Sequence, residues 1–199
     1  MVNDSQFNMA LDLEKKGTFM LPAQHYLLFA EYNQRMNGQL YQAIEPLSTE
    51  TINQDRGLFF QSILGTLNHL LVGDLIWLRR FSYFSERYVS LASLVSWPVP
   101  TSLSDIRYRD FSELKQARES LDRLIVEWLT NEVYSEDFIH KLVYANTAGV
   151  VSERNFGALI SHLFNHQTHH RGQLTTVLSQ LGIDVGVTDF LLEIPDDRI

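Results

Sequence analysis

The stretch SHLFNHQTHHRGQ, from Ser161 to Gln173, holds four of the seven histidines of this 199-residue chain. Its apolar residues recur with the period of an α-helix, and histidines four residues apart on a helix point the same way. Imidazole is the commonest side-chain ligand of transition metals in proteins. The stretch therefore predicts a helix that carries half of a metal site, and the other half must come from another segment.

Helical geometry selects two of the four clustered histidines as the inward-facing pair. At about 100° per residue, with His166 set at zero, the apolar stripe of this segment is centred at roughly 70–80°. His170 falls at about 40°, within the stripe, and His166 lies at its margin. His162 and His169 fall at roughly −40° and −60°, so we expect them at the rim or surface, where His162 can neighbour the site.

A further histidine, His69, lies in a second segment of helical pattern. Its neighbours one or two turns away are all small: Ser62, Gly65, Thr66 and Gly73. A glycine inside a helix lowers stability by up to about 1 kcal/mol relative to alanine, so space near His69 must be needed, either for close packing or for a cavity. We therefore expect His69, His166 and His170 to form one site. Three protein ligands with an open position are typical of catalytic zinc.

Four long helices are predicted from apolar periodicity and from the positions of proline and glycine. They cover residues 22–44, 58–84, 111–131 and 152 or 154 to 181, with Ser152 as a candidate N-cap and Gly182 as a candidate C-cap. The segment 85–110 contains two prolines that cannot lie inside a helix. It is long enough to cross the bundle, so that the next helix starts parallel to the last.

The remaining segments are expected to connect or cover these helices. A short helical turn is expected near Leu91–Val95, and an irregular or hairpin-like connection over 138–151. Phe190, Leu191 and Leu192 are expected to pack the tail, 183–199, against the bundle. Residues 1–20 form an N-terminal extension, and residues 1–199 are interpreted as a single all-α domain.

Composition excludes several classes of function. The formal net charge of −8 and the lack of a basic run argue against nucleic-acid binding. The chain has no cysteine, which excludes disulfides, thiolate zinc sites and a cysteine nucleophile. Any metal must be held by nitrogen or oxygen ligands. Clustered histidines favour zinc or nickel, with iron, manganese or copper as further choices, over magnesium or calcium.

No stretch approaches the roughly 18 uncharged apolar residues of a membrane span. Residues 1–10 are polar and do not resemble a secretory signal. We therefore expect a cytoplasmic protein without a membrane partner.

Several of the residues that could serve a site also have an ordinary structural explanation. A lone histidine on a helix is usually a hydrogen-bonded core or surface residue, and Trp77 is more often core than substrate platform. Arg171, at about 140°, is expected as a solvated charge at the edge of the stripe. Asp74 is five residues from His69 and faces elsewhere, so a structural ion pair is the better prediction for it.

Two motifs resemble those of the DinB/YfiT-like metalloenzyme family. These are HQTHHRGQL at 166–174, followed by Leu181-Gly182, and SILGTLNHLL at 62–71 with the segment 74–79. Residues 185–191 resemble the C-terminal segment of that family. The resemblance covers nearly the whole chain and implies a four-helix bundle in up-down-down-up order, which is often dimeric. It also implies a divalent metal held by three histidines, here His69, His166 and His170.

The function expected from these observations is that of a metal-dependent enzyme acting on a small-molecule substrate. The family resemblance implies either a hydrolase or a transferase that uses a low-molecular-weight thiol. No general base is evident, although Gln173 or His162 could orient water. The alternatives are a non-catalytic metal-binding or interaction bundle and a bundle that carries no metal.

Overall fold

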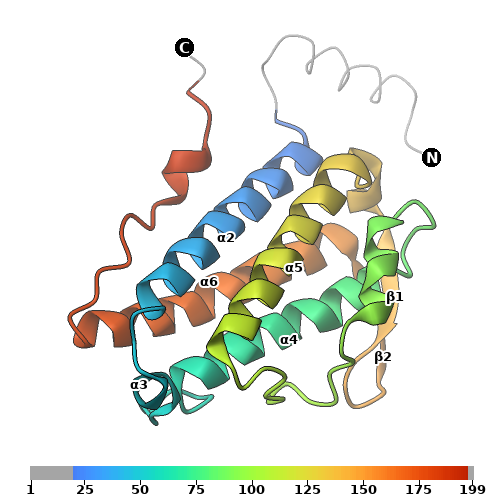
Figure 1. The fold of residues 1–199 in the computed structure, drawn as a ribbon. Helices are drawn as coiled ribbons and strands as arrows, with labels where there is room; N and C mark the ends of the chain where they lie inside the picture. Colours follow the sequence, from blue (N-terminus) through green and yellow to red (C-terminus); the bar gives the residue numbers. More distant parts are fainter. Residues whose placement is uncertain (1–19, 197–199) are drawn as a thin grey trace.

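The computed structural model describes residues 20–196, so the predicted extension 1–20 lies almost entirely outside the described residues, as does the end of the tail. Its four long helices are α2 (Pro22–Ile44), α4 (Ile63–Phe81), α5 (Phe111–Asn131) and α6 (Phe156–Gln180). They pack side by side, with α2 and α6 running in one direction and α4 and α5 in the other (Figure 1). The predicted all-α, up-down-down-up bundle is confirmed.

Shorter elements connect and cover the bundle. They are α3 (Thr49–Asn53), η1 (Ser90–Ser96), η2 (Ser135–Ile139), β1 (Lys141–Ala145), β2 (Val151–Asn155) and η3 (Phe190–Glu193). The strands β1 and β2 form an antiparallel hairpin in which Lys141 pairs with Asn155 and Ala145 with Val151. The hairpin-like connection is thus confirmed, as is the helical turn within the crossover. Every helix in the described part of the chain is too short or too polar to span a bilayer.

Helices α2 and α5 begin and end at the predicted residues, whereas α4 is shorter than the predicted 58–84. A bridge between Leu58 and Gln61 reverses the chain before α4, and Gln61 adopts a φ of 66°. The side chain of Ser62 then accepts a hydrogen bond from the amide of Gly65 at 3.0 Å and caps the helix. The apolar residues before Ser62 have a helical period but lie in this reversal.

Helix α6 also begins later than predicted. Ser152 is not its N-cap, because Ser152 pairs with Tyr144 in the hairpin. Asn155 is the cap, and its side chain accepts a hydrogen bond from the amide of Ala158 at 2.9 Å. At the other end, Gly182 has a φ of 77°, the left-handed conformation expected just after a helix.

The crossover runs the length of the bundle and makes α4 and α5 parallel. Near the start of α4, the side chain of Asn68 bonds to Tyr108, just before α5. Beyond the end of α4, the amide of Ser90 donates to Glu132, just after α5. The starts of α4 and α5 therefore lie close together, and so do their ends.

A buried polar network lies between the four helices. Arg118 of α5 forms ion pairs with Asp74 of α4 at 2.6 Å and with Asp122 at 2.8 Å. Arg171 of α6 donates to Asn33 of α2 and is only 3% exposed. The ion pair predicted for Asp74 is confirmed, but the prediction that Arg171 is solvated is wrong. Arg171 is buried because α6 packs on α2 as well as on α4, which covers the edge of its apolar stripe.

Of the three residues Phe190, Leu191 and Leu192, only Phe190 packs on α2. The ring of Phe190 stacks on that of Phe29, with 4.5 Å between centroids, and Arg35 binds Glu193. Leu191 and Leu192 are 73% and 61% exposed, so the prediction that they also pack inward is wrong. The short 3-10 turn of η3 directs only one side chain of the three to the bundle.

Candidate metal centre

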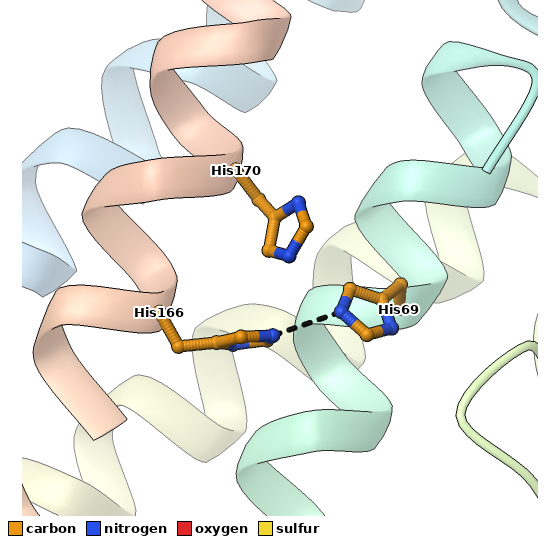
Figure 2. A group of neighbouring side chains, drawn as sticks. All are labelled: His69, His166 and His170. Atoms are coloured by element: carbon orange, nitrogen blue, oxygen red, sulfur yellow. Dashed lines mark hydrogen bonds between the residues drawn. The ribbon is translucent and has the colours of Figure 1, made fainter. Parts of the chain in front are cut away.

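Three histidines from two helices converge between α4 and α6. The ring centroid of His69 lies 4.8 Å from that of His166 and 4.6 Å from that of His170, and the latter two are 4.6 Å apart. One nitrogen from each ring lies within 4.8 Å of the others. Figure 2 shows the three rings pointing toward one another from facing helices. The structure thus brings together the three residues selected from the sequence.

Burial separates the inward pair on α6 from the other two histidines. His170 is buried and His166 is half-buried, whereas His162 and His169 are exposed. The ring of His162 nevertheless lies 6.1 Å from that of His166, centroid to centroid. His162 is therefore a neighbour of the centre at the surface, as the helical phase predicts.

Hydrogen bonds to Nδ1 orient two of the rings. Nδ1 of His69 lies 2.8 Å from the carbonyl oxygen of Leu103, and Nδ1 of His170 lies 2.8 Å from Oε1 of Gln173. Both partners are acceptors, so each Nδ1 carries the proton and each Nε2 is left with a free lone pair. Gln173 therefore orients His170. Nε2 of His69 accepts a hydrogen bond from Nε2 of His166 at 2.8 Å, and an ion held by both nitrogens would take the place of this hydrogen bond.

The two glycines of α4 permit close packing. A β-carbon at Gly73 would lie 2.9 Å from Cε1 of His166, and one at Gly65 would lie 2.1 Å from the carbonyl oxygen of Phe60. Both contacts are shorter than any side chain tolerates. Of the two sequence-based explanations for the small residues near His69, close packing is the one observed at these positions.

Phe60 is a site residue that the sequence did not reveal. Its ring stacks on His69, with 3.7 Å between centroids and 17° between planes, and lies 5.6 Å from the ring of His170. The helical pattern predicts a helix from residue 58 and gives no sign that Phe60 lies over His69. The chain reversal at Gln61 instead turns its ring over the imidazoles.

Asn68 is a second residue that the sequence did not reveal as part of the site. It projects away from His69, as expected, but its buried side chain holds the crossover. Its Oδ1 accepts from the amides of Arg107 and Tyr108 at 2.8 and 2.9 Å, and its Nδ2 donates to the carbonyl of Tyr108 at 2.9 Å. Asn68 thereby fixes the segment that carries the Leu103 carbonyl, the partner of His69.

Burial keeps the imidazoles neutral. Burial, followed by the neighbouring rings of His69 and His170, lowers the pKa of His166 to about 3. Burial also lowers the pKa of His69, against a smaller opposing effect of its hydrogen bond to Leu103. The pKa of His170 is likewise lowered by burial, against the raising effect of Gln173. Neutral imidazole is the form that binds metals.

The donor set fits a divalent transition metal. Nitrogens that each lie about 2.0–2.1 Å from one ion are at most about 4 Å apart, and the three donors here lie within 4.8 Å of one another. A small adjustment of the side chains closes the difference. Three imidazoles suit zinc, nickel, copper or iron better than magnesium or calcium.

Comparison with known proteins extends over most of the chain. The sequence model of the DinB family matches residues 20–197. The protein DinB of Bacillus subtilis (strain 168) is 26% identical over 163 residues, which cover 80% of this chain and 88% of that protein. The uncharacterized protein YizA of the same organism is 24% identical over 166 residues, which cover 82% of this chain and 92% of YizA.

A solved structure supports the fold. The crystal structure of a DinB-like protein from Bacillus cereus ATCC 10987 aligns with a TM-score of 0.51 at 19% identity. The alignment covers 80% of this chain and 94% of that chain. With a family match over nearly all of the described residues and a bundle of the same kind, this chain belongs to the DinB family.

Proposed function

We propose that His69, His166 and His170 bind one divalent transition-metal ion, zinc or nickel above all, in the centre of an enzyme that acts on small molecules. The observation that carries the proposal is the convergence of the three rings together with the acceptors on two Nδ1 atoms. Acceptors that hold the second nitrogen of a metal-binding imidazole are a regular feature of such sites. A buried histidine without a metal also needs an acceptor, so the convergence of three donor nitrogens within 4.8 Å is what favours a metal site.

The chain itself supplies orientation and protection from water. Leu103 and Gln173 hold two rings with Nε2 directed to the centre. Phe60 covers one face of His69 and removes that face from solvent. When bound, an ion of this kind acts as a Lewis acid that lowers the pKa of a water or thiol that it holds.

A catalytic role is favoured over a purely structural one by the number of ligands. Among residues 20–196, the group that could hold an ion consists of three histidines, without a fourth histidine or carboxylate. Structural zinc sites generally use four protein ligands, whereas catalytic sites use three and keep one position open. An interaction module whose ion merely ties α4 to α6 is the alternative.

Hydrolase and thiol transferase are the two reaction types to distinguish. The chain has no cysteine, so any thiol must arrive as a second substrate. Metal-loaded protein should be assayed with ester and amide panels, and separately with small thiols and reactive electrophiles. Turnover that requires an added thiol supports the transferase, and turnover without one supports the hydrolase.

Metal binding is tested first. Untagged protein is stripped with a chelator and titrated with Zn²⁺, and we expect one ion per chain. His69→Ala should lose this binding, while His140→Ala, which removes an exposed histidine outside the centre, should retain it. Unaltered zinc binding by His69→Ala would reject the centre.

An open position is tested in the cobalt-substituted protein. Addition of azide or of a small thiol should change the visible spectrum, because an exogenous ligand can join a centre with three protein ligands. A spectrum that does not respond supports the structural alternative. A homodimer, a small-molecule substrate and a cytoplasmic location stay predictions.

A further inference from the structure

A pocket of about 600 Å³ opens at the end of the bundle beside the metal centre. It is lined by Trp77 of α4, Tyr144 of β1, Arg154 and Asn155 of β2, and Ala158, Leu159 and His162 of α6. Tyr144 and Arg154 lie on the same face of the hairpin, because Arg154 pairs with Leu142, which is two residues from Tyr144 on β1. The hairpin therefore forms one wall, and we call this space the hairpin pocket.

The hairpin pocket lies about one helical turn from the metal centre on both α4 and α6. On α4, Trp77 follows Gly73, which abuts His166, by four residues, a rise of about 6 Å. On α6, His162 precedes His166 by the same interval. The ring of His162 lies 5.2 Å from that of Trp77 and 6.1 Å from that of His166, centroid to centroid. A molecule in the pocket is thus one turn away from the centre.

The pocket contains positive charge that no carboxylate compensates. Arg154 lines it and is exposed, and within residues 20–196 it forms no ion pair. The guanidinium of Arg80 lies over the rings of Trp77 and Tyr144, at 4.6 and 5.0 Å from their centroids. Arg80 likewise has no acidic partner in the described part of the chain. The pKa of His162 is lowered by its partial removal from water and then by the charge of Arg80.

Unpaired positive charge is unusual in a chain that is acidic overall. The chain carries a net charge of −8, so two unpaired arginines beside one pocket are not explained by general composition. Arginine recognises carboxylates through paired, charge-assisted hydrogen bonds. Asn155 and His162 are the other polar lining residues, and the rest of the lining suits a hydrocarbon or aromatic body: Trp77, Tyr144, Ala158 and Leu159.

We infer that the hairpin pocket binds a small organic acid, with its carboxylate at Arg154 and its apolar body against Trp77 and Tyr144, while Arg80 beside these rings adds positive charge. His162, which lines the pocket, separates the bound acid from His166. As the substrate site of an enzyme this assignment rests on the proposed function, but the binding of the acid does not require a metal.

Benzoate is a suitable probe, and the full chain without metal is the right sample. In ¹⁵N–¹H spectra, benzoate should shift the indole N–H of Trp77 in a saturable way, while those of Trp97 and Trp128 stay in place. The Trp77→Phe variant assigns the signal. Benzamide, which has the same shape without the charge, should bind roughly tenfold more weakly.

Charge variants complete the test. Arg154→Gln should weaken benzoate binding roughly tenfold, because it removes one charged donor from an exposed side chain. Arg123→Gln, which changes an exposed arginine of α5 outside the pocket, should leave the affinity unchanged. Equal binding of benzoate and benzamide, or an unchanged affinity in Arg154→Gln, overturns the assignment.

The two proposals fail separately. Benzoate binding without zinc binding retains the pocket and rejects the metal centre. Zinc binding without benzoate binding retains the centre and rejects the organic acid as its ligand class.

Discussion

Gly73 determines how closely His166 can approach His69 across the bundle. A β-carbon at this position would lie 2.9 Å from Cε1 of His166, while the Nε2 atoms of the two histidines are 2.8 Å apart. We predict that Gly73→Ala displaces the ring of His166 and weakens zinc binding roughly tenfold or more, as disturbance of ligand orientation generally does. Competition with a fluorescent zinc chelator measures the affinity.

Gly38→Ala is the matched control for this substitution. Gly38 lies in α2, is exposed, and has no atom within 4 Å of the position of an added β-carbon. Alanine there should leave zinc affinity unchanged and raise the free energy of unfolding by about 0.5–1 kcal/mol. Equal zinc affinities of wild type and Gly73→Ala would show that Gly73 has no part in the centre.

The sequence separates metal-binding residues from residues beside the site only where both lie on the same helix, because the helical period then gives their directions. His166 and His170 could be separated from His162 and His169, because burial along α6 follows the helical phase. Phe60 could not be found, since its place over His69 depends on the reversal at Gln61 and not on any local period.

At the scale of elements, the crossover between α4 and α5 supports the metal centre through Asn68. Three hydrogen bonds of this buried side chain join α4 to the crossover, which carries the Leu103 carbonyl to His69. We predict that Asn68→Ala lowers the free energy of unfolding by about 1–3 kcal/mol, because it leaves buried amides unpaired. It should also weaken zinc binding. Urea unfolding and chelator competition measure the two effects.

Asn165→Ala provides the comparison for Asn68→Ala. Asn165 precedes His166 as Asn68 precedes His69, but it is exposed. Its removal should change neither stability nor zinc affinity by a measurable amount. If both variants behave alike, the crossover does not position His69.

Element boundaries were predictable where a local signal decides them. Pro22 marks the start of α2, and Asp110 caps α5 by accepting from the amide of Glu113 at 3.0 Å. The starts of α4 and α6 differ from the predicted residues, because pairing with other residues overrides the local helical pattern of apolar residues. Leu58 bridges to Gln61, and Ser152 pairs with Tyr144 in the hairpin.

At the scale of the whole molecule, one buried network ties the four helices together. Removal of Asp74 leaves Arg118 and Arg171 beside a single carboxylate, that of Asp122. We predict that Asp74→Ala lowers the free energy of unfolding by about 3 kcal/mol, because an uncompensated charge stays buried. Glu153→Ala, which breaks an exposed pair with Lys141, should lower it by under about 1 kcal/mol. Similar losses in the two variants would contradict this account.

The stability of the metal-free protein should depend on pH through His166. Its folded pKa of about 3 lies below the value of about 6.5 in the unfolded chain. The unfolded state therefore binds more protons below pH 6.5, so the contribution is complete above that pH and is lost as the pH falls toward 3. Between about pH 7.5 and about pH 5 we expect a loss of about 1 kcal/mol from this residue, after allowance for partial exposure.

Urea unfolding of wild type and His166→Gln at the two pH values isolates this contribution. The variant lacks the titrating group, so its stability should fall less over the same interval. An identical decrease in both proteins would mean that His166 does not govern the response to acid.

The proposed function requires a metal ion between α4 and α6, and anomalous diffraction tests this requirement directly. Crystals of the zinc-loaded protein should show an anomalous peak at the zinc edge about 2.0–2.1 Å from the Nε2 atoms of His69, His166 and His170. At least one further coordination position should be occupied by solvent. A peak elsewhere, or none between these three rings, would contradict the proposed function.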